Sequence, residues 1–168
     1  MAQKHTQPDN SIKAVCFTGH REIEISSAYL IPSALKNVLK ELILRGAQRF
    51  LAGGAIGFDT IAALCVLELK AQYPHIKLEL ILPCRNQTQK WNDLNKDVYS
   101  AILERADKVT YLHDSYTASC MHDRNRRLVD EADVVIAYLA HSGGGTAYTA
   151  AYALKQKREL INVYDLIQ

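Results

Sequence analysis

The sequence of 168 residues lacks the run of about 18 or more apolar residues that a membrane-spanning helix needs. Residues 1–10 are polar and lack the apolar segment of a secretory signal peptide. Neither sign of charge dominates, because the formal net charge is +2 and 23% of the residues are charged. These absences predict a cytoplasmic protein without membrane contact and without a global basic field for nucleic acid. We expect residues 1–12 to form a disordered polar tail.

Several chemical signatures are missing as well. The motifs G-x-S-x-G, H-E-x-x-H and G-x-G-x-x-G do not occur. Three histidines follow predicted strands, but no two have the helical spacing of metal ligands, and we expect no metal site at His20, His113 and His141. The cysteines lie far apart without C-x-x-C spacing, so we expect reduced core thiols at Cys16, Cys65, Cys84 and Cys120.

The sequence does contain a regular alternation of apolar strands and amphipathic helices. Strands are predicted at 14–18, 49–52, 76–82, 108–112, 133–139 and 160–164, with Pro83 ending the third. Helices are predicted at 32–45, 58–72, 91–106, 117–131 and 146–156, with Pro32 in a first helical turn. This alternation predicts a three-layer α/β domain over residues 13–168. We expect a mostly parallel sheet of about six strands with helices on both faces.

In such sheets, ligands bind beyond the carboxyl ends of the strands, near the topological switch point. Polar and glycine-rich segments follow the predicted strands: Thr18, Gly19, His20 and Arg21 after the first, residues 53–59 after the second, and residues 142–146 after the fifth. Because the carboxyl ends of parallel strands share one edge, these segments predict a binding site there.

The two glycine turns suit a ligand that carries phosphate. Glycine lets a ligand approach the backbone, and a helix N-terminus attracts an anion. Asp59 would repel phosphate at the start of the second helix, so we assign phosphate to the later turn, at Gly143, Gly144, Gly145 and Thr146. The earlier turn would admit a ribose or a second phosphate at Gly53, Gly54 and Gly57, with Asp59 bonding a ribose hydroxyl. Alternatively, the glycines only permit tight turns and Asp59 only caps its helix.

Charged and amide side chains complete the predicted site. Arg21 opens a loop of about a dozen residues, and Arg124 and Asn125 lie on the helix predicted at 117–131. We expect both arginines to neutralise ligand charge. The alternatives are a surface arginine at position 21 and a hydrogen-bonded core amide at position 125.

Taken together, these residues resemble the SLOG superfamily of Rossmann-like nucleotide-binding domains, in particular its YpsA/YoqJ-type branch of largely unassigned function. The resemblance rests on Thr18 to Arg21, residues 53–59, Leu82-Pro83 with Gln89 and Trp91, Arg124-Asn125 with Val129-Asp130, and Gly144-Gly145-Thr146. It implies a Rossmann-like fold and a pocket for a nucleotide derivative, such as an ADP-ribose or NAD-like molecule. Because relatives often form dimers, it also implies a homodimer.

Two more distant resemblances supply alternatives. The LOG family of phosphoribohydrolases carries P-G-G-x-G-T-x-x-E, and Thr149 stands at the position of its acid. N-glycosidase activity on a nucleotide or NAD is therefore the second hypothesis, with Asp59 or Asp123 as a substitute acid. Residues 142–153 resemble the DNA-processing protein A family, which binds single-stranded DNA. This third hypothesis lacks a basic groove with interleaved aromatic residues, so we do not expect nucleic acid as a partner.

Overall fold

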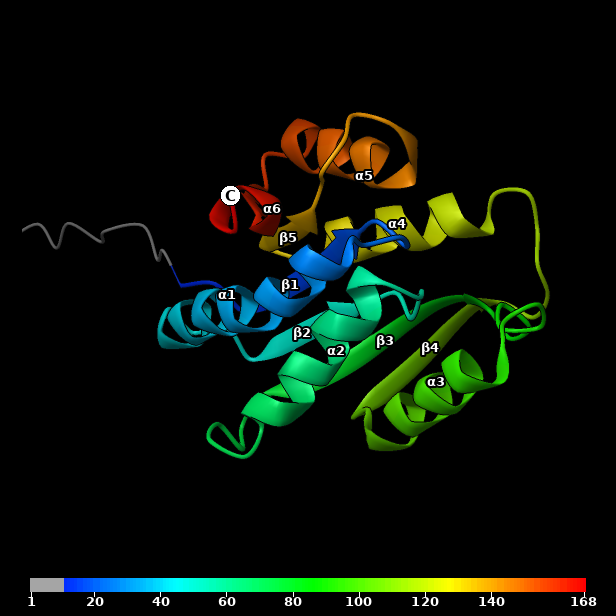
Figure 1. Cartoon of the computed structure of the whole chain (residues 1–168), viewed down its shortest axis with the longest axis horizontal. Helices are drawn as coiled ribbons and strands as arrows, with labels where there is room; N and C mark the ends of the chain where they lie inside the picture. Colours follow the sequence, from blue (N-terminus) through cyan, green and yellow to red (C-terminus); the bar gives the residue numbers. More distant parts are fainter. Residues whose placement is uncertain (1–10) are drawn as a thin grey trace, which may run out of the picture.

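The computed structural model describes residues 11–168 (Figure 1). Most of the expected tail, residues 1–10, lies outside the described residues. Ile12, at the end of that tail, is buried, and its backbone N–H donates to the carbonyl of Arg45 over 3.4 Å. Within residues 11–168, no helix combines the length and apolar character that crossing a membrane requires.

Six parallel strands form one sheet in the order β4-β3-β2-β1-β5-β6. They are β1 (Ala14–Gly19), β2 (Arg49–Ala52), β3 (Lys77–Cys84), β4 (Lys108–His113), β5 (Val134–Tyr138) and β6 (Glu159–Asn162). The chain moves outward from β1 to β4 and then returns to the other side of β1, where Thr18 pairs with Ala137. The topological switch point therefore lies between β1 and β5.

Helices cover both faces of the sheet, as the sequence predicts. They are α1 (Ile25–Leu44), α2 (Phe58–Leu69), α3 (Asp93–Arg105), α4 (Cys120–Glu131), α5 (Gly144–Lys155) and the short α6 (Val163–Leu166). Side chains alternate along β1, so Val15 and Phe17 pack with α1 and α2, while Cys16 packs with Leu128 of α4 and Ala153 of α5. The expected three-layer Rossmann-like fold is confirmed (Figure 1).

Several predicted boundaries are wrong. Helix α1 begins at Ile25, so Pro32 lies inside it and the loop after Arg21 is short. Strand β3 continues through Pro83 to Cys84. Because β2 pairs with β3 only as far as Leu80, the missing N–H of Pro83 removes no bond between these two strands. Helix α4 begins at Cys120 rather than at residue 117, and α2 ends at Leu69 rather than at residue 72.

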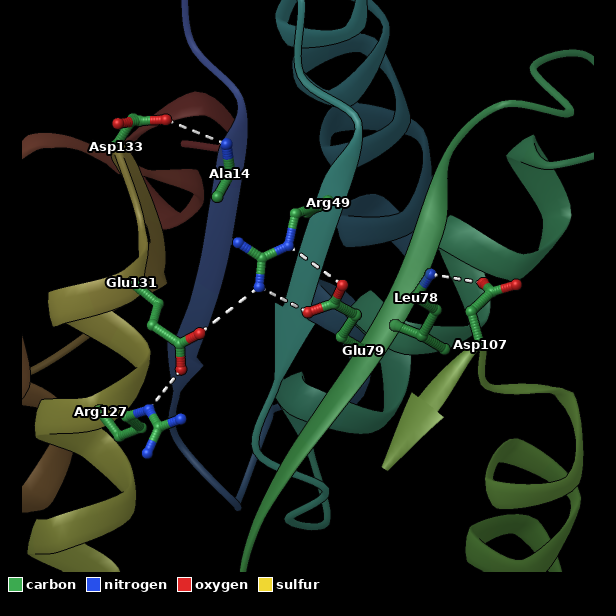
Figure 2. Close-up of polar contacts among 8 residues, drawn as sticks. All are labelled: Ala14, Arg49, Leu78, Glu79, Asp107, Arg127, Glu131 and Asp133. Carbon is green, nitrogen blue, oxygen red and sulfur yellow. Dashed lines mark hydrogen bonds and ion pairs between the residues drawn. The ribbon is translucent and has the colours of Figure 1, made fainter. Parts of the chain in front are cut away.

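Charged side chains organise the amino ends of the strands (Figure 2). Asp133 accepts from the N–H of Ala14 over 3.0 Å, and Asp107 accepts from the N–H of Leu78 over 2.8 Å. Arg49 forms two hydrogen bonds with Glu79, at 3.0 and 2.7 Å, and a longer one of 3.4 Å with Glu131. Asp133 and Asp107 thus satisfy backbone N–H groups at the starts of strands, while Glu79 and Glu131 balance the charge of Arg49.

Candidate functional site

A cavity of about 270 Å³ opens beyond the carboxyl ends of β1 and β5, at the topological switch point. Four segments form its wall: the end of β1 with the loop that follows, the turn between β2 and α2, the first half of α4, and the turn before α5. Most of the residues predicted from the sequence line it, namely Thr18, Gly19, His20, Arg21, Asp59, Arg124, Asn125, Gly143, Gly144, Gly145 and Thr146. Segments distant in sequence are therefore brought together at the predicted edge.

The glycines of the β2–α2 turn lie elsewhere. Gly53, Gly54 and Gly57 are not among the lining residues, and protein atoms occupy the space next to each. A Cβ at position 53 would lie 2.6 Å from Nη1 of Arg124, and one at position 54 would lie 2.4 Å from Leu82. These glycines admit neighbouring parts of the protein, so the structure gives each of them a packing role.

Gly57 and Gly19 let two loops cross closely. A Cβ at position 57 would lie 2.4 Å from the carbonyl oxygen of Arg21, and its φ of +83° disfavours other residues. At Gly19, an added Cβ would lie 2.4 Å from the side chain of Phe58. The N–H of Phe58 also donates to the carbonyl of His20 over 3.2 Å. The β1–α1 loop is thereby held against the start of α2.

The glycines in the turn before α5, by contrast, are not packed against other parts of the protein. Among residues 11–168, apart from the chain neighbours of each glycine and the nearby backbone of α5 itself, no atom lies within 4 Å of a Cβ built at Gly144 or Gly145. At Gly143 the nearest atom is Nδ1 of His141, at 3.9 Å. No side chain of the described residues caps the N-terminus of α5. The first N–H groups and the positive end of the helix dipole therefore face open space beside the cavity.

Arg124 and Asp59 place opposite charges in the buried wall. Nη1 of Arg124 donates to the carbonyl of Gly53 over 2.5 Å, and its Nε donates to Oδ1 of Asn125 over 2.7 Å. The carboxylate of Asp59 accepts from the N–H of Ala55 over 3.2 Å. Burial raises the pKa of Asp59, against the opposing effects of the Arg124 charge, the Ala55 N–H and the Arg21 charge. Burial lowers the pKa of Arg124, and the negative charge of Asp59 opposes that shift.

These contacts define distinct roles. The guanidinium of Arg124 is committed to Gly53 and Asn125, so it braces the wall and contributes charge. Asn125 is half-buried, and its side-chain carbonyl oxygen accepts from Arg124, which satisfies the acceptor half of the amide. Arg21 is exposed, and its guanidinium forms no ion pair or hydrogen bond with the part of the chain that the structure describes. It is the side chain at the mouth that can meet an incoming anion.

The side chain of His20 contacts the β5–α5 turn through hydrogen bonds and a stacked ring. Its Nε2 accepts from the N–H groups of Ala140, at 3.0 Å, and His141, at 3.4 Å. The rings of His20 and His141 stack with centroids 3.8 Å apart. Burial lowers the pKa of His20, and His141 lowers it further. The neutral ring, with its proton on Nδ1, is the form that fits both accepted hydrogen bonds.

Other candidate residues lie away from the cavity. His113 contacts Asp123 over 2.9 Å, so it does not join His20 and His141. Among residues 11–168, no three histidine, cysteine or acidic side chains are grouped as metal ligands would be. Asp123 does not line the cavity, whereas Asp59 does. Thr149 is buried, and its hydroxyl donates to the carbonyl of Gly145 over 2.8 Å, which is an interaction within α5.

Sequence reasoning missed four residues of the wall: Phe17, Ala55, Met121 and His141. Met121 precedes Arg124 and Asn125 by one helical turn, so its position on the same face of α4 was the available signal. Phe17 is the last residue of the apolar part of β1, residues 14–17, and its type alone does not distinguish core from cavity wall.

The sequence is similar to a protein family of known sequence pattern and to individual bacterial proteins. The family model described as the YspA SLOG family (YpsA) matches residues 15–168. UPF0398 protein YpsA of Bacillus subtilis (strain 168) is 26% identical over 158 residues, covering 88% of this chain and 88% of that protein. The SPbeta prophage-derived protein YoqJ of the same organism, itself uncharacterised, is 30% identical over 131 residues, covering 70% of this chain and 77% of YoqJ.

Solved structures show a similar architecture. DNA processing protein A from Helicobacter pylori, studied for its single-stranded DNA binding mode, superposes with a TM-score of 0.63 at 21% identity. The match covers 90% of this chain but 65% of that protein, so this chain spans less than two thirds of it. DNA processing protein A from Streptococcus pneumoniae gives a TM-score of 0.63 at 18% identity, with 88% and 49% covered. At these identities the similarity concerns the fold alone.

Proposed function

Because this chain belongs to the YspA SLOG family, we propose that it binds a nucleotide or nucleotide-derived ligand, such as an ADP-ribose or NAD-like molecule, at the switch-point cavity. One observation carries the proposal. The uncapped N-terminus of α5, with open space beside Gly144 and Gly145, adjoins the same cavity as the buried carboxyl of Asp59. N–H donors for a phosphate and a carboxyl acceptor for a hydroxyl therefore stand beside one small cavity, as a sugar phosphate requires.

The roles follow from the geometry. The backbone N–H groups at the start of α5, together with the hydroxyl of Thr146, would bind phosphate. Arg21, which has no ion-pair partner within residues 11–168, would neutralise its charge. Asp59 would accept from a ribose hydroxyl, while Arg124 balances the charge of Asp59 within the wall.

A thermal-shift screen tests the proposal with AMP, ADP-ribose, cyclic ADP-ribose and NAD. A ligand at about ten times its Kd adds about 1.4 kcal/mol of stability, which raises the Tm of a chain of this size by about 3–5 °C. Gly145→Val should abolish the shift and leave the Tm of the free protein nearly unchanged, because a Cβ at this position meets open space. The absence of a shift with all four compounds would refute the proposal.

Hydrolysis of an N-glycosidic bond is a second candidate, and Asp59 is the observation in its favour. Asp59 is buried in the cavity wall, and burial raises its pKa, which favours the protonated form that a general acid needs. Chromatography of AMP or NAD after incubation would detect released base. Release that persists in the Asp59→Asn variant would exclude this carboxyl as the catalytic group.

Single-stranded DNA is a third candidate because the Helicobacter pylori neighbour, which shares the fold, has a single-stranded DNA binding mode. Binding of an oligonucleotide through backbone phosphates would weaken steeply with salt. An electrophoretic shift that disappears in the Gly145→Val variant would place the strand in the switch-point cavity. A shift unaffected by that variant would locate DNA elsewhere.

A cytoplasmic location and a homodimer belong to the same proposal. All four cysteines are buried and free, which fits a reducing compartment. On α1, Ile25 and Tyr29 are 79% and 82% exposed and lie four residues apart on one helix face, where a second copy would cover them. Sedimentation tests the dimer. The wild type should sediment as a dimer and the Tyr29→Glu variant as a monomer, and a monomeric wild type would contradict the proposal.

A further inference from the structure

A second and larger cavity, of about 650 Å³, adjoins the first. Arg21 and Met121 line both cavities, so one molecule can occupy the two at once. The remaining wall of the second cavity comes from the segment between β3 and α3, with Ile56 and Tyr116 at its sides. This is the region of Gln89 and Trp91, which the roles assigned above leave without a function.

The second cavity has two aromatic side chains, Trp91 and Tyr116, in its wall. Trp91 is half-buried, and its ring meets Tyr99 edge to face with centroids 5.5 Å apart. Tyr116 is more exposed, but its backbone N–H donates to Oδ1 of Asn86 over 3.0 Å, which ties its loop to the β3–α3 segment. The Trp91 ring is thus oriented by a neighbour, and a planar group can stack on it.

Three side chains with amide groups line the same cavity: Asn86, Gln87 and Gln89. Gln87 donates from Nε2 to the hydroxyl of Tyr99 over 3.2 Å and to the carbonyl of Gly54 over 3.5 Å. A Cβ at position 54 would meet Leu82 at 2.4 Å and Gln87 at 3.1 Å, so the β2–α2 turn packs directly on this wall. The β2–α2 turn therefore helps to position the wall of the second cavity.

The charged residues that line the second cavity indicate which kind of ligand group it can bind. Among its lining residues, all within the described chain, Arg21 and Lys90 are cations and none is acidic. A cationic group would find no counter-charge there. Aromatic faces, amide donors and acceptors and no carboxylate together suit a neutral planar heterocycle.

We propose that the second cavity binds the nucleobase of a ligand whose sugar phosphate occupies the first. This inference rests on the proposed function, and it assigns Trp91 as the stacking residue and Gln89 as the amide that bonds the edge of the base. Arg21 and Met121 lie where the two parts of the ligand join.

The chain contains one tryptophan, so Trp91 reports on its own environment. AMP and ribose 5-phosphate share the sugar phosphate, and only AMP carries a base. In the wild type, we expect AMP to bind at least tenfold more tightly than ribose 5-phosphate. We also expect AMP at saturation to quench Trp91 emission, while ribose 5-phosphate raises the Tm without changing the emission.

Calorimetry of variants gives the second measurement. Trp91→Leu should reduce the affinity for AMP at least tenfold, to that for ribose 5-phosphate, and should leave the latter within about twofold. Tyr73→Leu is the matched control, because Tyr73 is another half-buried aromatic packed on the core just before β3, at the opposite edge of the sheet. This variant should leave both affinities unchanged.

The outcomes separate the two proposals. If both compounds bind equally and emission does not change, the base site is refuted while the switch-point cavity remains a binding site. If AMP binds more tightly but neither the emission nor the Trp91→Leu affinity responds, the base lies elsewhere and the inference fails. If neither compound binds, the proposed function fails for this class of ligand and the inference fails with it.

Discussion

Individual glycines serve opposite purposes in this chain. At Gly19 and Gly57, a neighbouring part of the protein fills the space that a side chain would need. At Gly144 and Gly145, that space is open within the described residues and lies beside the cavity. A sequence shows only that Cβ is missing, so it cannot distinguish room for a ligand from room for a neighbouring residue. This is why Gly19, Gly53, Gly54 and Gly57, all predicted to face a ligand, have protein atoms where their side chains would stand.

Alanine substitution should separate the two kinds of glycine. Gly57→Ala combines a positive φ of +83° with a Cβ 2.4 Å from a backbone oxygen, so it should lower the free energy of unfolding by about 2–4 kcal/mol. Gly145→Ala, the matched control on an open helical position, should raise it by up to about 1 kcal/mol. Urea unfolding measures both. Equal effects would contradict the distinction.

His20 should make stability depend on pH near neutrality. Its pKa in the folded protein lies below the ordinary value of 6.5, because the ring is buried beside His141. Below pH 6.5 the unfolded chain therefore binds more protons than the folded one, and stability falls as the pH falls toward the native pKa. Above pH 6.5 this contribution is fully present. The hydrogen bonds from the Ala140 and His141 N–H groups are lost when Nε2 is protonated.

Urea unfolding measured at about pH 7.5 and about pH 5.5 tests whether His20 makes stability depend on pH. The wild type should be less stable at the lower pH, and His20→Gln should lose most of the difference. The carboxyl groups whose pKa is lowered, Asp107, Asp123 and Glu159, lose their contributions only at more acidic pH, since their ordinary values are 3.8 and 4.5. A full pH difference retained in His20→Gln would assign the effect to another group.

At the scale of elements, the start of α1 shows where sequence reasoning fails. Glu24 occupies the N-cap without a side-chain cap bond, and the first turn contains no acidic residue, so no start signal precedes Ile25. Pro32 then resembles the first residue of a helix, although it lies one to two turns inside α1. Tertiary packing of Ile31, Leu35 and the residues that follow maintains the helix despite the proline.

Pro32→Ala tests the position of Pro32 in the helix. Inside a helix, proline lacks one backbone hydrogen bond and clashes with the preceding turn, so alanine should raise the free energy of unfolding by about 1–3 kcal/mol. At a first helical position, proline is favourable and the same substitution would lower stability. Thermal and urea unfolding therefore distinguish by sign a helix that begins at Ile25 from one that begins at Pro32.

Strands and the location of the site were easier to predict than the contacts. Runs such as Val134–Tyr138 are apolar throughout because both faces of the sheet are covered, and parallel strands bring their carboxyl ends to one edge. The bond from Arg124 to Gly53 and the bonds that His20 accepts from Ala140 and His141 join segments more than 70 residues apart, so they depend on side-chain geometry. Periodicity carries no information about such pairs.

The amino and carboxyl ends of the strands, on opposite sides of the molecule, carry different kinds of residue. At the amino ends, Asp107 and Asp133 accept from strand N–H groups, and Arg49 is held by Glu79 and Glu131 (Figure 2). At the carboxyl ends, open glycines and Arg21 meet the cavity at the switch point. The ion pairs of Arg49 and the proposed binding site are therefore separated by the length of the strands.

Hydrogen exchange with AMP present should show this separation. We expect slower exchange in residues 18–25 and 141–149, which lie far apart in sequence but together at the cavity, because the ligand would cover both segments and bond N–H groups at the start of α5. Exchange near Leu78 and Ala14, at the amino ends, should slow only as much as ligand binding stabilises the whole protein.

Arg49→Gln is the matched variant. It breaks a half-exposed ion pair, so it should cost about 1 kcal/mol of stability and leave the affinity for AMP unchanged. Protection concentrated at the amino ends, or an affinity that falls with Arg49→Gln, would place the ligand at the other edge of the sheet.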